Sequence, residues 1–313
     1  GATVAAKDAI GAVNTLAGLT INGKNTSGST DSVTVKLFSN DEGTASTPSV
    51  FTVTTLTAGG YENVKLVSEG KANTANAVTT LTATAQKTVT IEGDKKLTVG
   101  NALSATTVAA SASTGGVDLT LAGTAVSGGK QTATGGTGND TFRIDAGVIN
   151  KDIKIAGGEG TDTLVLTKVA AGNIDLTGVT NAELISGVSG FENLSFGGKT
   201  LLIDDATLNR FTDKTINVVE KGAVATTLNA SAVLGSTSKL NVDASEMTVN
   251  GFTFAISNGI DGFKGSSQAD TITVGASAFL TDADVLNGGA GNNNALNFDT
   301  TGNTKQIVTA AQL

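Results

Sequence analysis

Short segments in which apolar and polar residues alternate recur along the chain. Alternation with a period of two places the apolar side chains on one face of a β-strand. The clearest examples are Val33–Leu37, Thr88–Ile91 and Leu164–Leu166. Helical periodicity is short, and we expect a helix only at Asp204–Phe211, where an aspartate can cap one or two turns. The pattern therefore predicts many short strands joined by many turns.

A long internal repeat underlies this pattern. Four pairs of similar segments share one nearly constant separation, roughly 130 residues. The pairs are Gly60–Leu66 with Gly190–Phe196, Asp140–Phe142 with Asp270–Ile272, Gly157–Gly160 with Gly288–Gly291, and Asp31–Val35 with Asp162–Leu166. We expect residues 1–30 to end one repeat unit, 31–161 and 162–292 to form two units, and 293–313 to begin another. The chain is then an excerpt of one longer, continuous solenoid.

A shorter spacing lies inside each repeat unit. It separates Asp140 from Asp162, and it separates Asp270 from Asn293. In both cases it is roughly 22 residues, which is the size expected for successive coils of a β-solenoid that each hold two or three strands. We therefore predict an all-β fold, a right-handed parallel β-helix or β-solenoid with calcium-binding turns. A tandem of β-sandwich domains is the alternative, because a unit of about 131 residues can hold one such domain.

Composition restricts the possible functions. The 313 residues include 40 Gly and one Pro but no Cys, His or Trp, and the net charge is −8. The lack of His and Cys excludes Ser-His-Asp and Cys-His catalysis, and no phosphate-binding loop is present, so we expect a protein that is not an enzyme. Basic residues are scattered, which argues against binding to nucleic acid or to anionic membranes. No apolar run is long enough for membrane insertion.

Two segments match the glycine–aspartate nonapeptide G-G-x-G-x-D-x-U-x, in which U is a large apolar residue. They are Gly135–Arg143 and Gly157–Val165. The glycines permit turns with positive φ that expose carbonyl oxygens, and the aspartate adds a charged oxygen. Hard oxygen ligands gathered at a tight turn suit Ca²⁺. If the coils stack, Asp140 and Asp162 lie one above the other and can share an ion, without which they repel each other.

Two further segments are incomplete versions of the nonapeptide. Gly265–Thr273 keeps one glycine and Asp270, whereas Gly288–Leu296 keeps the glycines but has Asn293 at the aspartate position. Fewer charges weaken calcium binding, so we expect the complete pair to be the better site and this pair to be weak or empty. The alternative for every such turn is that the aspartate only hydrogen-bonds the backbone of the turn.

The repeated G-[YF]-E-N segments suggest a functional role for Glu62 and Glu192 at first sight. We favour a structural interpretation instead. Tyr61 and Phe191 are expected to fill the core, and the Glu-Asn pair that follows each of them is expected to form part of a turn or a ladder.

The two complete nonapeptides resemble those of the repeats-in-toxin superfamily, although here they are isolated rather than in long tandem. The resemblance implies a β-roll in which carbonyl oxygens and carboxylates bind calcium. The implied ligands are the carbonyl oxygens of Gly136, Gly138, Gly158 and Gly160 and the carboxylates of Asp140 and Asp162, with Asp270 as a ligand of the weaker pair.

The chain as a whole resembles the surface-layer proteins of Gram-negative bacteria, of the Caulobacter and Campylobacter type. These combine Thr-, Ala- and Gly-rich solenoids with sparse nonapeptides and with segments like Gly160–Leu164 and Gly190–Leu194. The resemblance implies an extracellular structural subunit, exported by a type I system, that assembles with copies of itself into a calcium-dependent cell-surface lattice. A cell-surface polysaccharide, bound through a region outside this excerpt, is a further expected partner. The alternatives are a secreted adhesin and an extracellular polysaccharide-degrading enzyme.

Overall fold

The computed structural model describes residues 2–7, 14–23, 30–41, 43–44, 47–83, 87–124, 130–167, 172–275 and 280–298. Its regular structure is almost entirely β-strand, and every strand pair whose register is described is parallel. The chain divides into two compact units. Unit 1 comprises Gly1–Val148, Asp152–Leu164 and Gly187–Phe191, and unit 2 comprises Ile149–Lys151, Val165–Ser186 and Glu192–Leu313.

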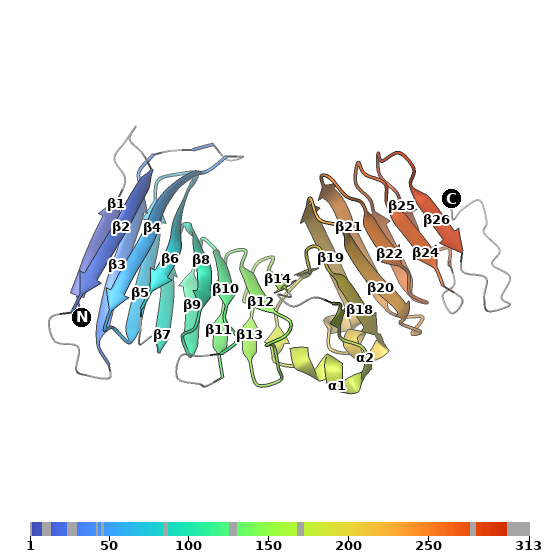
Figure 1. The fold of residues 1–313 in the computed structure, drawn as a ribbon, viewed down its shortest axis with the longest axis horizontal. Helices are drawn as coiled ribbons and strands as arrows, with labels where there is room; N and C mark the ends of the chain where they lie inside the picture. Colours follow the sequence, from blue (N-terminus) through green and yellow to red (C-terminus); the bar gives the residue numbers. More distant parts are fainter. Residues whose placement is uncertain are drawn as a thin grey trace. The chain divides into compact units, whose positions relative to one another are not determined.

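Unit 1 is a stack of coils, each of which gives one strand to each of two sheets (Figure 1). The first sheet has the order β1 (Ala2–Lys7), β3 (Ser32–Ser39), β5 (Asn63–Gly70), β7 (Thr88–Gly93), β9 (Thr107–Ser113), β11 (Thr132–Thr134), β13 (Lys154–Ala156) and β16 (Val188–Ser189). The second has the order β2 (Thr15–Asn22), β4 (Ser49–Gly59), β6 (Thr74–Thr82), β8 (Lys96–Leu103), β10 (Val117–Leu121) and β12 (Thr141–Asp145). Strand β14 (Thr163–Thr167) contains the boundary between the units.

Unit 2 repeats this two-sheet arrangement. One sheet has the order β15 (Ile174–Asp175), β18 (Thr200–Asp204), β20 (Thr226–Ala232), β22 (Phe252–Ala255), β24 (Thr271–Val274) and β26 (Ala295–Phe298). The other has the order β17 (Asn193–Ser195), β19 (Thr215–Gly222), β21 (Lys239–Met247), β23 (Ile260–Lys264) and β25 (Val285–Asn287). The short helical segments are α1 (Gly178–Ala182), η1 (Glu183–Ile185), α2 (Asp205–Leu208) and η2 (Thr212–Lys214).

The core consists of apolar side chains that lie in register from coil to coil. In unit 1 one such column is formed by Val33, Val64, Val89, Val108, Ala133 and Ile155. In unit 2 a corresponding column is formed by Leu201, Leu228, Phe254 and Ile272. All of these side chains are buried. Each coil adds its own side chains to these columns, so the core is continuous from coil to coil. Burial of one large apolar side chain contributes roughly 1.5–3 kcal/mol to stability.

The predicted all-β fold, a parallel β-helix or solenoid, is confirmed. Val33–Leu37, Thr88–Ile91 and Leu164–Leu166 lie within strands β3, β7 and β14. The parallel pairing excludes a tandem of β-sandwiches, whose strands are antiparallel. The expected helix at Asp204–Phe211 is the short α2, in which the Asp204 side chain caps the backbone N–H of Thr207. The division of the chain into two long repeat units stays a prediction.

Candidate functional site: the glycine-rich turns

Each complete nonapeptide forms a turn between two strands. The first turn leads from β11 to β12, and the second leads from β13 to β14. The glycines are required by close contact between coils. A Cβ on Gly135 would lie 1.7 Å from the carbonyl oxygen of Gly157, and one on Gly157 would lie 1.8 Å from that of Gly190. Gly158 and Gly160 also have positive φ angles of 115° and 119°, which other residues rarely adopt.

Asp140 connects its own turn to the preceding coil. The backbone N–H of Gly136 donates to its Oδ2 atom at 2.7 Å, and the backbone N–H of Val117 donates to its Oδ1 atom, also at 2.7 Å. The side chain is buried. Burial raises the pKa of the Asp140 carboxyl, although these two N–H groups and the charge of Lys96 act in the opposite direction. Asp140 is thus a buried acceptor for two backbone groups.

Asp162 repeats this contact one coil further on. It is fully buried, and its Oδ1 atom accepts the backbone N–H of Asp140 at 2.8 Å. The structure therefore brings Asp140 and Asp162 together in adjacent coils, as their spacing in the sequence led us to expect. We call such a contact, in which a side-chain oxygen accepts a backbone N–H from the preceding coil, an inter-coil bridge.

Four of the oxygens predicted to bind calcium accept backbone N–H groups, one of them being Oδ1 of Asp162. Both carboxylate oxygens of Asp140 accept N–H groups, and the carbonyl oxygen of Gly136 accepts the N–H of Glu159 at 2.9 Å. Ca²⁺ takes six to eight oxygen ligands that converge on one point. Within the described residues, no group of three or more Asp and Glu side chains gathers in a way that could hold a metal ion.

The other predicted ligands lie in the same two turns. A Cβ on Gly160 would lie 2.7 Å from the carbonyl oxygen of Gly138, and one on Gly158 would lie 2.3 Å from that of Gly136. These glycines therefore pack against carbonyl groups of the preceding coil. Both carboxylate oxygens of Asp140 and the carbonyl oxygen of Gly136 are turned toward N–H groups, and these three oxygens do not fit a calcium site in this arrangement. Calcium binding stays a prediction from the sequence.

The incomplete turns of unit 2 contain the same contacts. Asp270 is buried and accepts the N–H of Phe252 at 2.6 Å and that of Ser266 at 2.8 Å. In the next coil Asn294, rather than the expected Asn293, lies in the aspartate position. Its Oδ1 atom accepts the N–H of Asp270 at 2.9 Å. The turn has one residue more than its counterparts, and Asn293 accommodates it with a φ angle of 66°.

One further inter-coil bridge lies in turns that have no nonapeptide. Asp284 accepts the N–H of Asp261 at 2.8 Å, and within its own turn Asp261 accepts the N–H of Ser257 at 3.0 Å. Burial raises the pKa of Asp261 to about 7, and the charge of Asp284 acts in the same direction. Sequence analysis missed these residues. The available signal was the four-residue spacing from Ser257 to Asp261, which equals that from Gly136 to Asp140.

Glutamate forms the same kind of bridge. Glu62 is buried and accepts the N–H of Asp31 at 2.8 Å, so the structural interpretation of the first G-[YF]-E-N segment is supported. Tyr61 is buried beside it. In unit 2, Glu220 accepts the N–H of Phe196, and burial raises the pKa of Glu220 to about 7.

The second G-[YF]-E-N segment differs from the first. Phe191 is only half-buried and packs edge-on against Phe142, with ring centroids 6.0 Å apart. The side chain of Glu192 is exposed, and its carbonyl oxygen accepts the side-chain amide of Asn217. The first segment thus supplies an inter-coil bridge through its glutamate, and in the second the glutamate side chain is exposed.

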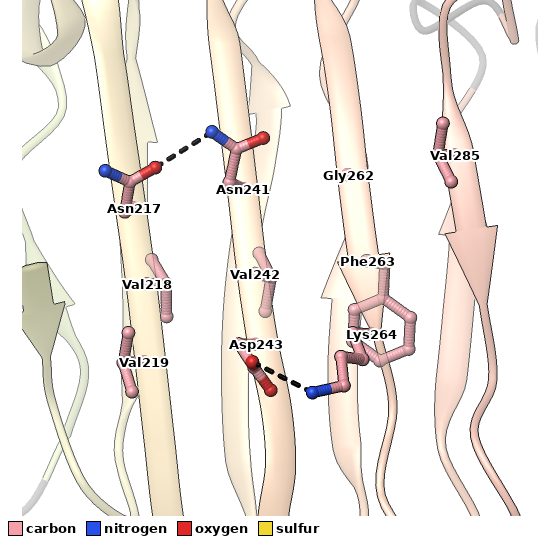
Figure 2. A pocket seen from close by; sticks show the side chains of 10 residues that line it. All are labelled: Asn217, Val218, Val219, Asn241, Val242, Asp243, Gly262, Phe263, Lys264 and Val285. Atoms are coloured by element: carbon pink, nitrogen blue, oxygen red, sulfur yellow. Dashed lines mark hydrogen bonds and ion pairs between the residues drawn. The ribbon is translucent and has the colours of Figure 1, made fainter.

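A shallow groove crosses the outer face of β19, β21, β23 and β25 (Figure 2). Gly262 has no side chain and leaves space between Asn241 and the exposed Val285. An ion pair between Asp243 and Lys264, with N···O at 3.3 Å, borders the groove. Burial raises the pKa of Asp243, but hydrogen bonds from Ser245 and the Lys264 ammonium outweigh it and lower the pKa. The groove contains no pair of carboxylates suited to acid–base catalysis.

These observations define the protein as a parallel β-solenoid whose turns are connected by buried acidic side chains and, at Asn294, by an exposed amide. No family model matches the chain, and no curated protein or solved structure is significantly similar to it. Among the described helices, none is long and apolar enough to cross a membrane.

Proposed function

We propose that this chain is a structural segment of an extracellular surface layer, which assembles with copies of itself into a lattice and does not catalyse a reaction. The single observation that supports this proposal best is that the buried polar groups of the turns serve as hydrogen-bond acceptors between coils. The acidic side chains inside the turns accept backbone N–H groups from neighbouring coils. These acidic side chains hold neighbouring coils together and are not presented to a substrate.

The two groups whose properties most resemble those of catalytic acids support the same view. Asp261 and Glu220 have pKa values raised to about 7, a range in which general acids and bases operate. Both are almost fully buried, and both accept backbone N–H groups. A substrate has no access to them, so their raised pKa values are a consequence of burial in the stack.

The outer faces have the regularity that lateral contacts between copies require. Thr200, Thr227, Thr253 and Thr271 lie in register on four successive strands of one sheet in unit 2. Adjacent strands are about 4.8 Å apart, so the hydroxyl groups form an evenly spaced column. A column of short, uncharged side chains allows a second flat surface to approach closely. Export by a type I system and location at the cell surface follow from the sequence resemblance and belong to this proposal.

Electron microscopy of the purified chain at increasing concentration tests the proposal. We expect ordered two-dimensional arrays, and we expect Thr227→Lys together with Thr253→Lys to prevent them without changing the melting temperature. A matched control places lysine at two exposed corner residues, Val224 and Val249. A chain that stays monomeric at every concentration contradicts the proposal and favours the adhesin alternative.

A further inference from the structure

The inter-coil bridge is a property of the fold and not of the nonapeptide. In the complete turn of unit 1, Asp140 accepts N–H groups from Val117 and Gly136, both at 2.7 Å. Asp284 lies in a turn without glycine pairs, yet it accepts the N–H of Asp261 at 2.8 Å and that of Thr281 at 2.7 Å. The same two contacts, one to the preceding coil and one within the turn, therefore form with and without the calcium-binding motif.

The positions of the backbone N–H groups that donate these hydrogen bonds explain why the bridges are needed. Val117 is the first residue of β10, and Phe252 is the first residue of β22. Both residues are fully buried. A buried N–H group without a partner is costly, so the start of each of these strands requires an acceptor. The carboxylates of Asp140 and Asp270 supply it from the following coil.

Asn294 provides an independent indication of the role of this position. It occupies the aspartate position of the last glycine-rich turn, where its Oδ1 atom accepts the N–H of Asp270. Its amide nitrogen donates to the carbonyl oxygen of Gly288 at 2.8 Å. An amide keeps the hydrogen bond to the preceding coil but supplies no negative charge for a cation. The position therefore requires an acceptor, whether or not that acceptor is charged.

The glycines of the nonapeptides have an equally local explanation. Gly136 lies so close to the preceding coil that a Cβ would be 1.9 Å from the carbonyl oxygen of Ser113. In the corresponding turn of unit 2 this position is Ser266, whose hydroxyl group approaches Asp270 at 3.2 Å. The glycine pattern thus follows the distance between coils, and it changes where the coils leave more space.

We propose that the glycine–aspartate turns of this protein are inter-coil bridges that operate without a bound cation. The carboxylate of each turn takes the place that calcium occupies in the predicted β-roll, because it connects consecutive coils directly through their backbone N–H groups. This inference is independent of lattice assembly, since it concerns the cohesion of a single chain.

The test is thermal unfolding of the full chain in calcium and in chelator, together with calorimetric calcium titration. Asp140→Ala is expected to lower the melting temperature by roughly 5 °C or more, equally in both solutions. Asp284→Ala, in a turn without the motif, is expected to behave in the same way. The matched control is Glu159→Gln, which removes one negative charge from an exposed side chain between Gly158 and Gly160 and should leave the melting temperature unchanged.

Saturable calcium binding by the wild-type chain, with a calcium-dependent rise in melting temperature that Asp140→Ala removes and Glu159→Gln keeps, would overturn the inference. An unchanged melting temperature for Asp140→Ala in both solutions would overturn it as well. If Asp140→Ala does not fold, Asp140→Asn and the wild-type titration decide the question. The asparagine variant keeps one acceptor and should lose about half as many degrees. Array formation, scored separately by microscopy, reports on the proposed function alone.

Discussion

The complete turns of unit 1 and the incomplete turns of unit 2 differ in sequence but not in the way they hold their coils. Asp140 and Asp162 form an acid–acid pair, whereas Asp270 and Asn294 form an acid–amide pair. The bridge between the two members is 2.8 Å long in unit 1 and 2.9 Å long in unit 2. The pair in unit 2 carries one negative charge fewer than the pair in unit 1, but its acceptor keeps the same geometry. The comparison indicates that the hydrogen bond is what the fold requires at this position.

The packing around the glycines does differ between the units. A Cβ on Gly157 would lie 1.8 Å from the backbone carbonyl of Gly190, whereas the nearest atom to a Cβ on Gly288 is the side-chain nitrogen of Asn294, at 2.8 Å. A backbone carbonyl such as that of Gly190 cannot move without shifting the chain, but an exposed amide side chain can rotate aside. Unit 1 is therefore the more tightly constrained of the two at this one position of the turn.

The largest effect is expected from adding a methyl group at these two glycines. Gly157→Ala should destabilise the protein by more than about 3 kcal/mol, because it forces two coils apart. Gly288→Ala should cost about 1 kcal/mol, because Asn294 can reorient. Gly18→Ala, whose Cβ would meet only ordinary contacts at 3.9 Å, is the control. Denaturant unfolding measures all three variants, and equal losses at Gly157 and Gly288 would remove the contrast between the units.

Removal of the acceptor should have the next largest effect. Asp270→Ala leaves the buried N–H groups of Phe252 and Ser266 without partners, and we expect a loss of about 2–3 kcal/mol. Asn294→Ala should cost about 1 kcal/mol, because the side chain is exposed and water can replace it. Unfolding free energies of the two variants and of the double variant test this order. A greater loss for Asn294→Ala would contradict it.

The pH dependence of stability should distinguish the buried acids of unit 2. The folded-state pKa values of Asp261 and Glu220 are raised to about 7 from ordinary values of 3.8 and 4.5. Below the ordinary values both carboxyls are protonated in the folded and unfolded states, and the stabilisation is complete. As pH rises to about 7 the unfolded chain releases these protons first, so the free energy of unfolding falls, by about 2 kcal/mol per group between pH 5 and 7.

Denaturant unfolding at a series of pH values measures this slope. Asp261→Asn and Glu220→Gln should each make it shallower. Asp243→Asn is the matched control, because the pKa of Asp243 is lowered and its titration lies below this range. A slope that neither Asp261→Asn nor Glu220→Gln changes would refute the assignment to these two buried groups.

The smallest effects are expected from ion pairs on the outer faces. Arg143 and Asp118 connect β12 to β10 in unit 1 through both guanidinium nitrogens and are partly shielded, with side chains 37% and 20% exposed. The pair of Lys264 and Asp243 in unit 2 is 62% and 46% exposed. Double-mutant cycles should give a coupling energy of about 1 kcal/mol for the first pair and a few tenths of a kcal/mol for the second. Equal coupling energies would show that exposure does not decide their strength.

The sequence predicted those features that depend on local pattern. Alternation located the strands, and the spacing of Asp140 and Asp162 located two turns that lie in adjacent coils. The features that it missed depend on register between distant segments. The one-residue shift from Asn293 to Asn294 arises because an added residue adopts a positive φ angle. The bridge between Asp284 and Asp261 depends on the packing of coils whose turns have no glycine pair to mark them in the sequence.

The buried aspartates of the glycine-rich turns bridge in one direction along the chain. Val117 is bridged by Asp140, which is itself bridged by Asp162, and in each case the acceptor comes from the later coil. The bridges therefore have a direction along the chain, from a donor in the earlier coil to an acceptor in the later coil. In a nascent chain, which emerges with its N-terminal end first, the backbone N–H groups at the strand starts of one coil lack these acceptors until the next coil has been made. Loss of a coil from the C-terminal side removes the acceptor of such an amide in the coil before it, whereas loss from the N-terminal side removes a donor from a carboxylate in the coil that follows. Unravelling from the two ends therefore breaks the same kind of bridge with different results, since it frees a backbone N–H group in one case and a carboxylate in the other.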